Sequence, residues 1–149
     1  PKALLKAKNR LRAITKRNRG VNVRKVMQEI KVYMTGWLNY YGIASLKTKM
    51  REWDEWLRHR IRANIWKQWK KPKTKRKNLM KLGVPEYYAH MAANSHRGYW
   101  FTVNTGAVTR GITNERLTRV GFFELSPAYE SIQSACIGRA VYRTVRTVR

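Results

Sequence analysis

The sequence predicts an all-α protein in which a three-helix bundle precedes a smaller, mostly helical appendage. Three observations lead to this fold class. Apolar residues recur every three or four positions in three successive segments, which is the spacing of one face of a helix. A glycine or a proline follows each of these segments and marks where a helix would end. The connections between the segments are short, as they are in helical bundles.

The first segment covers residues 2–18. Its apolar residues from Leu4 to Ile14 alternate spacings of three and four, and Lys or Arg stands at nearly every other position. This pattern predicts a basic amphipathic helix. Gly20 is expected to stop it, because glycine accepts the left-handed conformation that is common just past a helix end.

The second segment runs from Val23 to Tyr41. Asn22 before it is a residue type that caps helices, and Gly42 after it is expected to end the helix. The apolar stripe of this segment is wide enough to contact two neighbouring helices. Gly36 lies within the stripe, from which we expect a close crossing with another helix.

The third segment is expected to be helical over about residues 48–71. Pro72 is expected to enforce its end, because the residue before a proline avoids the helical region. The predicted core face consists of Met50, Trp53, Leu57, Ile61 and Ile65.

The remaining residues differ in pattern and charge. Residues 1–77 hold 24 of the 33 Lys and Arg, so a compositional boundary follows the third helix. We expect Pro85 to open a short helix, whereas 99–103 is equally compatible with a helix and a short strand. The predicted division is a bundle at 1–72, a basic linker at 73–77, a smaller domain at 78–132 and a basic tail at 133–149. The tail is either an ordered arm on a partner or a disordered segment.

The charge of the chain indicates its class of partner. With 33 Lys and Arg against eight Asp and Glu, the formal net charge is +25, which a polyanion would neutralise. Nucleic acid is the first expectation and an anionic membrane surface is the alternative, although no apolar run is long enough to span a bilayer. The single Cys136 excludes an internal disulfide framework and fits a reducing compartment, so a cytoplasmic location is expected. The N-terminus shows no signal peptide. Because the chain begins with Pro1 and not with Met, we expect a fragment or a processed product.

Catalytic chemistry is not expected. Asp54 is the only aspartate, and it forms the only acidic cluster together with Glu52 and Glu55. On a helix that also carries Arg51 and Arg58, these acids are predicted to be salt-bridge partners rather than metal ligands. The three histidines are predicted to be surface or capping residues. We therefore expect no catalytic site, no metal site and no cofactor in this chain.

Binding is the chemistry that remains. Lys and Arg contact phosphates, and exposed aromatic rings stack on unpaired bases. Trp66 and Trp69 are the candidate stacking residues, although packing against the C-terminal appendage is an open alternative for them. The candidate RNA-phosphate contacts are Lys16, Arg17, Arg19, Arg24, Arg58, Arg62, Lys70, Lys71, Lys73, Lys75, Arg76 and Lys77. The candidates for contacts with DNA or further RNA are Arg97, Arg110, Arg116 and Arg119.

Three stretches of the chain closely resemble the maturase-specific segment of group II intron-encoded reverse transcriptases. These are GWLNYYG at 36–42, DEWLRHRIR at 54–62 and IWKQWKKPKT at 65–74. Two further similarities, ITKRNRGVN at 14–22 and GYWFTVN at 98–104, lie within a resemblance that covers about residues 10–132.

The resemblance implies two domains and a set of partners. Residues 1–72 are similar to the thumb, also called the X or maturase domain, and residues 78–132 to the D domain, which is associated with DNA targets. The parent family holds intron RNA for splicing, and it copies the mobile intron into DNA during retrohoming. The implied partners are group II intron RNA, target or primer-template DNA, and an upstream palm and fingers region. The Tyr-x-Asp-Asp motif of the palm is absent here, so Mg²⁺ is expected in the parent polymerase and in the intron RNA but not in this chain.

Three alternatives stay open. A sequence-neutral basic nucleic-acid-binding protein would have the same composition. A nuclease or polymerase in its own right would depend on Asp54. A purely structural bundle would fasten the palm to the rest of its protein with little RNA contact of its own.

Overall fold

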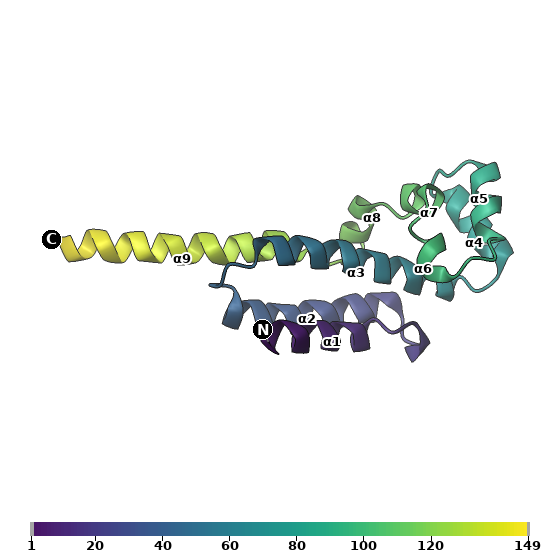
Figure 1. Cartoon of the computed structure of the whole chain (residues 1–149). Helices are drawn as coiled ribbons and strands as arrows, with labels where there is room; N and C mark the ends of the chain where they lie inside the picture. The colour runs from purple at the N-terminus through teal and green to yellow at the C-terminus, as the bar shows by residue number, and fades with distance from the viewer. Residues whose placement is uncertain (1, 149) are drawn as a thin grey trace.

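The structure is a computed structural model that describes the backbone of residues 2–148, and their side chains except at 140 and 142–148. Within these residues it contains nine α-helices, one 3₁₀ turn and no strand, so the predicted all-α class is confirmed (Figure 1). The elements are α1 (Lys2–Ile14), η1 (Arg17–Arg19), α2 (Val23–Tyr41), α3 (Lys47–Gln68), α4 (Pro72–Lys81), α5 (Glu86–Ala93), α6 (Tyr99–Thr102), α7 (Gly106–Gly111), α8 (Asn114–Arg119) and α9 (Leu125–Val148). The alternative of a short strand at 99–103 is wrong, because α6 occupies this stretch.

The long helix α3 organises the molecule (Figure 1). α1 packs on α2 and α2 on α3, and the first half of α9 packs against both α2 and α3. The small helices α4 to α7 gather around the C-terminal end of α3, where α6 contacts it, and α8 lies beside the middle of α3. The second half of α9 extends beyond the bundle at the opposite end. The predicted bundle and helical appendage are therefore present, and α9 adds a fourth helix to the bundle.

The bundle forms because its helices bury their apolar stripes against one another. Leu11 of α1, Ile30 and Met34 of α2, and Met50 and Leu57 of α3 have no exposed surface. Burying a large apolar side chain contributes roughly 1.5–3 kcal/mol relative to leaving it exposed. These layers of side chains hold α1, α2 and α3 in place before any polar contact is considered.

Local signals set the start of α2 as expected. Asn22 caps this helix, since its Oδ1 accepts a hydrogen bond from Arg24 N at 2.8 Å. Gly20 has a φ of 67°, the left-handed conformation that its residue type allows. α1 ends at Ile14, earlier than expected, and the η1 turn takes up the residues that follow.

Tyr129 attaches α9 to the turn between α2 and α3. Its Oη donates to Ala44 O at 2.6 Å and accepts from Leu46 N at 2.9 Å. Its ring is buried in the core. Because its hydroxyl both donates and accepts a hydrogen bond, Tyr129 fixes the position of α9 relative to this turn, and its buried ring adds apolar area to the core.

The predicted tail 133–149 does not begin where a domain ends. α9 is continuous from Leu125 to Val148, so the expected boundary at 132 falls inside a helix. Residue 149 and the side chains of 142–148 lie outside the described residues.

The lysine run after α3 is helical, and the expectation of a basic linker at 73–77 is wrong. α3 ends at Gln68, and α4 begins at Pro72. Proline is favourable at this position because its fixed φ suits the first turn, where its missing N–H is not needed. Lys70, with a φ of 50°, makes the turn between the two helices.

Gly36 lies on an exposed face of α2 and not at a helix crossing. A Cβ at this position would have no neighbouring atom within 4 Å. Glycine inside a helix is destabilising by roughly 0.5–1 kcal/mol relative to alanine. We therefore expect Gly36→Ala to raise the free energy of unfolding by about that amount in urea titrations. Gly42→Ala is the contrasting variant and should destabilise the chain, because its Cβ would lie 2.9 Å from Ile132 Cγ2. A lowered stability for Gly36→Ala would indicate an unrecognised contact.

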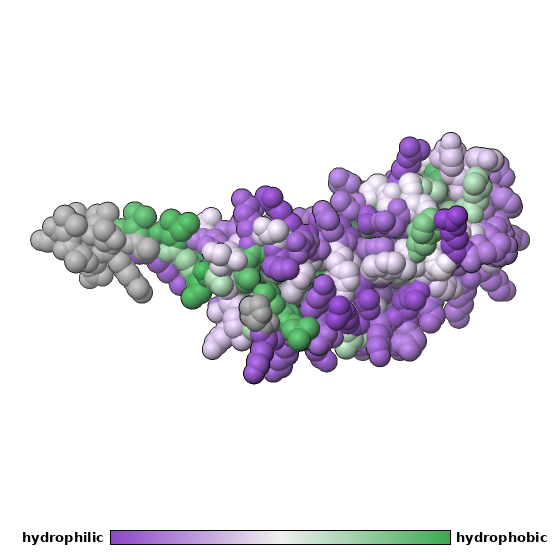
Figure 2. Space-filling model, viewed as in Figure 1, coloured by the Kyte–Doolittle hydropathy of each residue, from purple (hydrophilic) through white to green (hydrophobic). Residues whose placement is uncertain are grey.

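Hydrophilic side chains cover most of the face seen in Figure 2. Hydrophobic atoms on this face gather where α9 leaves the bundle, and Ile137 and Val141 are exposed on that helix. Each helix among residues 2–148 is too short or too polar to cross a lipid bilayer.

Candidate nucleic-acid interface

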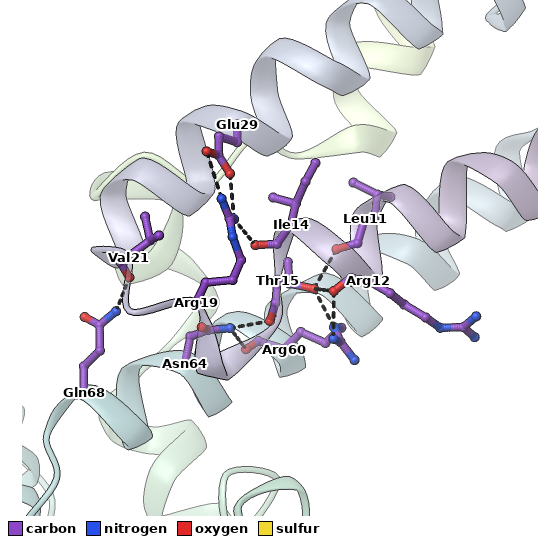
Figure 3. Close-up of polar contacts among 10 residues, drawn as sticks. All are labelled: Leu11, Arg12, Ile14, Thr15, Arg19, Val21, Glu29, Arg60, Asn64 and Gln68. Atoms are coloured by element: carbon purple, nitrogen blue, oxygen red, sulfur yellow. Dashed lines mark hydrogen bonds and ion pairs between the residues drawn. The ribbon is translucent and has the colours of Figure 1, made fainter.

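A ladder of three polar side chains on α3 fixes the turn between α1 and α2 (Figure 3). Arg60, Asn64 and Gln68 are spaced by four residues, so they lie on one face of the helix. Arg60 Nε donates to Thr15 Oγ1 at 2.5 Å, and Asn64 Nδ2 donates to Thr15 O at 2.8 Å. Gln68 Nε2 donates to Val21 O at 2.8 Å. The turn that contains η1 is thereby held against α3.

Arg19 fastens the same turn to α2. Its guanidinium donates to the two carboxylate oxygens of Glu29 at 2.7 and 3.1 Å, and to Ile14 O at 2.5 Å (Figure 3). The hydrogen-bonded pair raises the pKa of Arg19 and lowers the pKa of Glu29. Both terminal nitrogens of Arg19 are therefore engaged within the fold, while the residue stays exposed and its phosphate contact stays a prediction.

A cleft of about 390 Å³ lies between this turn, α3 and α6, and we call it the α3–α6 cleft. It is lined by Thr15, Lys16, Arg17 and Asn18 from the turn, by Arg60, Ala63 and Lys67 from α3, and by Tyr99 and Trp100 from α6. No Asp or Glu is among these lining residues. The fold thus brings a basic turn and an aromatic pair together, although they are far apart in the sequence.

The charge in the α3–α6 cleft is positive and uncompensated. Lys16, Arg17 and Lys67 are exposed, and none of them forms an ion pair within the described part of the chain. Arg60 is half-buried, and its hydrogen bonds go to a hydroxyl and to Arg12 O, which are neutral acceptors. Burial lowers the pKa of Arg60, and the charges of Arg12 and Arg17 lower it further. A site with this potential attracts anions.

Trp100 forms one wall of the cleft and rests on His59. The two rings stack with their centroids 3.4 Å apart and their planes at 17°. His59 Nε2 lies 2.6 Å from Trp100 O and donates to it in the tautomer that carries the proton there. Burial lowers the pKa of His59, and the hydrogen bond to Trp100 O opposes that shift. The prediction that His59 is a surface or capping residue is therefore wrong. His59 supports the indole of Trp100, a residue that is 45% exposed.

Most of the predicted phosphate-binding cations remain exposed. They lie on the α1–α2 turn, at the start of α2, around the start of α4 and on the appendage, and their contact with a nucleic acid stays a prediction. The exposed members are Lys16, Arg17, Arg19, Arg24, Lys70, Lys71, Lys73, Lys77, Arg97, Arg110 and Arg119.

Lys75 and Trp66 are buried, which contradicts their prediction as RNA contacts. They are 8% and 3% exposed. Lys75 Nζ lies 4.9 Å from the ring centroid of Trp66 and 4.9 Å from that of Tyr99. Burial lowers the pKa of Lys75. This cation–π cluster joins α3, α4 and α6, so Trp66 packs against the appendage, which was the alternative expected for it. Trp69 is half-buried beside Trp66.

Arg62 joins α3 to the appendage and Arg116 joins helices within it, a structural role that the sequence did not predict. Arg62 is 8% exposed and donates through Nε to Ile112 O at 2.7 Å. Arg116 Nη1 donates to Leu82 O at 2.7 Å and to Gly111 O at 2.6 Å. Both arginines satisfy carbonyl groups at the C-terminal ends of α4 and α7, which have no partner within their own helices.

Arg58 and Arg76 form ion pairs within the chain. Arg58 Nη2 lies 3.7 Å from Glu124 Oε1, and only 15% of the Arg58 side chain is exposed. Arg76 Nη1 lies 3.1 Å from Glu86 Oε1 at the surface. These two predicted RNA contacts are therefore partly neutralised by nearby carboxylates.

Asp54 forms no ion pair with any residue that the structure describes, so the predicted salt bridges are not seen for it. It is 3% exposed, and its two carboxylate oxygens accept hydrogen bonds from Leu125 N at 2.7 Å and from Ser126 N at 2.9 Å. The acid thus caps the N-terminus of α9. No three side chains of His, Cys, Asp or Glu come together as possible metal ligands in the part of the chain that the structure describes.

Sequence reasoning missed the aromatic residues that are exposed beside cations. Trp100 and Phe101 are 45% and 51% exposed, and Arg97 Cζ lies 4.5 Å from the ring centroid of Phe101. The run of three aromatic residues at 99–101, directly after Arg97, was the available signal. It was ambiguous because a strand at this position would turn alternate side chains toward a core.

The fold and the cleft define a class, namely a basic, all-helical protein in which exposed cations and an exposed aromatic ring meet in one cleft. The family model for the group II intron maturase-specific domain matches residues 4–83, which include α2, α3 and all of α4. This match covers more than half of the chain, which therefore belongs to the group II intron maturase-specific domain family. Membership implies a role in the splicing of group II introns, with intron RNA as a partner. No curated protein matches the chain.

Proposed function

We propose that this chain is the RNA-binding C-terminal part of a group II intron maturase and reverse transcriptase. It binds folded intron RNA through the exposed cations of the α1–α2 turn and of α4, and so assists splicing. An upstream palm and fingers region supplies polymerisation. The exposed cations of the appendage, Arg97, Arg110 and Arg119, contact target or primer-template DNA during retrohoming.

The family match at residues 4–83 carries this proposal. The placement of the cations supports it. Arg24 on α2 and Lys73 and Lys77 on α4 are exposed to solvent, and none of them forms an ion pair within the described residues. Cations that remain unpaired are available for phosphate contacts, which release counterions and make affinity depend on salt.

The first test compares folded group II intron RNA with duplex DNA of equal length. We expect the complete chain to prefer the intron RNA at ~0.2 M salt, where sequence-neutral electrostatic binding is weak. Filter binding or fluorescence anisotropy measures both affinities. Equal affinities would favour a sequence-neutral basic protein instead.

A charge-reversal variant tests the role of α4 directly. Lys73 and Lys77 are four residues apart and both exposed, so they lie on one face of this helix. Lys73→Glu with Lys77→Glu is expected to weaken RNA binding about tenfold and to reduce the slope of log affinity against log salt by about two.

The matched control reverses two exposed lysines outside the predicted contacts, Lys31→Glu with Lys47→Glu, and changes the net charge equally. It should weaken binding much less than the α4 variant. The same loss in both variants would mean that net charge alone, and not α4, determines RNA affinity.

A further inference from the structure

We propose that the α3–α6 cleft binds one unpaired RNA nucleotide, with the base stacked on Trp100 and the phosphate between Lys16, Arg17 and Lys67. This inference rests on the proposed function and narrows it to one site. It also assigns to α6, which lies outside the residues of the family match, a direct part in RNA recognition.

The exposed face of Trp100 is the first reason. One face of the indole is covered by His59 at a centroid separation of 3.4 Å, yet 45% of the residue remains exposed. A ring that is supported on one face and open on the other is a stacking platform, and every base offers a face for it. Bases within a duplex are already stacked on both faces, so the partner must be an unpaired base.

The cations of the cleft are the second reason. Lys16, Arg17, Arg60 and Lys67 line it together with no acidic residue. Arg60 cannot be neutralised by its own partners, since Thr15 Oγ1 and Arg12 O carry no charge. Four cations without a carboxylate repel one another, and a phosphate placed among them relieves that repulsion.

The size and rigidity of the cleft are the third reason. Its volume of about 390 Å³ lies within the range of ligand pockets and suits a single nucleotide. Asn64 and Gln68 hold the basic turn on α3 through hydrogen bonds of 2.8 Å (Figure 3). His59 holds the indole of Trp100. Both halves of the site are therefore in place before the nucleotide arrives, which lowers the entropic penalty of binding.

The test uses two RNA hairpins of otherwise equal sequence. One is fully paired, and the other has one additional unpaired nucleotide, the fluorescent base 2-aminopurine. The complete chain is expected to bind the hairpin with the unpaired nucleotide about tenfold more tightly than the fully paired one, because one base stacks on an aromatic ring. Stacking of 2-aminopurine on Trp100 should also quench its fluorescence. A DNA hairpin with the same unpaired base measures how far the site depends on ribose.

Substitutions locate the effect. Trp100→Ala is expected to abolish both the tenfold preference and the quenching. Tyr87→Ala, which removes a ring that is 69% exposed on α5 and outside the cleft, should change neither. Thermal melting checks that each variant is folded; if Trp100→Ala is not, Trp100→Phe takes its place and should reduce the quenching.

Three outcomes separate the two proposals. Equal affinity for both hairpins without quenching overturns the cleft proposal and leaves RNA binding intact. Quenching that is undiminished in the folded Trp100 variant places the base elsewhere and also overturns it. Failure to bind either hairpin or folded intron RNA overturns the proposed function itself.

Discussion

Asp54→Ala is expected to lower the free energy of unfolding by about 3 kcal/mol, because it removes a buried carboxylate that satisfies two backbone N–H groups. Leu125 N and Ser126 N lie 2.7 and 2.9 Å from its oxygens, at the first turn of α9. A negative charge at that end also interacts favourably with the helix dipole. The substitution leaves both N–H groups unpaired and weakens the attachment of α9 to α3.

Urea unfolding followed by circular dichroism measures this effect, which corresponds to a fall in melting temperature of about 6–12 °C for a chain of this size. Asp54→Asn keeps one acceptor oxygen and should be intermediate. Glu52→Gln is the matched control, because its contact with Lys49 at 3.4 Å is at the surface and contributes little. If Asp54→Ala were as stable as Glu52→Gln, the cap would not hold α9. Loss of a strand-cleaving or polymerising activity in a folded Asp54→Asn variant would instead revive the enzymatic alternative.

The features of the fold that the sequence predicts correctly are determined by residues close to one another in the sequence. Asn22 caps α2 and Gly20 adopts the left-handed conformation, because each needs only the residues beside it. The apolar stripes of α1 to α3 likewise follow from helical spacing. The sequence does not predict the start of α4 at Pro72, because a proline is compatible both with the end of one helix and with the first turn of the next.

The parts that the sequence does not predict depend on distant contacts. Trp66 and Lys75 become buried because α6 folds back onto the end of α3, so that Tyr99 lies against Lys75. Asp54 finds its partners at Leu125 and Ser126, on a helix that begins about seventy residues later. Helical periodicity gives the direction of a side chain on its own helix, but it does not say which face a later segment will cover.

The candidate site likewise combines residues that the sequence predicts with residues that only distant contacts bring together. The basic residues of the α1–α2 turn are predicted from composition, and Lys16 and Arg17 do line the cleft. The sequence predicts Trp66 and Trp69 as the stacking residues, because helical spacing places them on a flank beside the main core face. In the structure the accessible ring is that of Trp100, which reaches the turn only through the packing of α6 on α3.

Arg62 is expected to control the stability of the appendage and not the affinity for RNA. It is buried without an acidic partner in the described residues, and it donates to Ile112 O and Asn114 Oδ1, each at 2.7 Å. Burial lowers its pKa, and the charge of Arg58 lowers it further. Placing a guanidinium in such a site costs several kcal/mol, which these hydrogen bonds offset only while both acceptors are present.

Arg62→Ala is therefore expected to destabilise the chain by about 3 kcal/mol, since it leaves a cavity and two unpaired acceptors. Arg62→Lys keeps the charge but cannot reproduce the planar pair of donors, so we expect roughly half of that loss. Arg24→Ala is the opposite control, because Arg24 is exposed on α2 and its loss should weaken RNA binding while changing stability by less than about 0.5 kcal/mol. Urea unfolding and RNA binding, measured on the same three variants below their unfolding midpoints, separate the two roles. An Arg62 variant of unchanged stability and reduced RNA affinity would return this residue to the nucleic-acid interface.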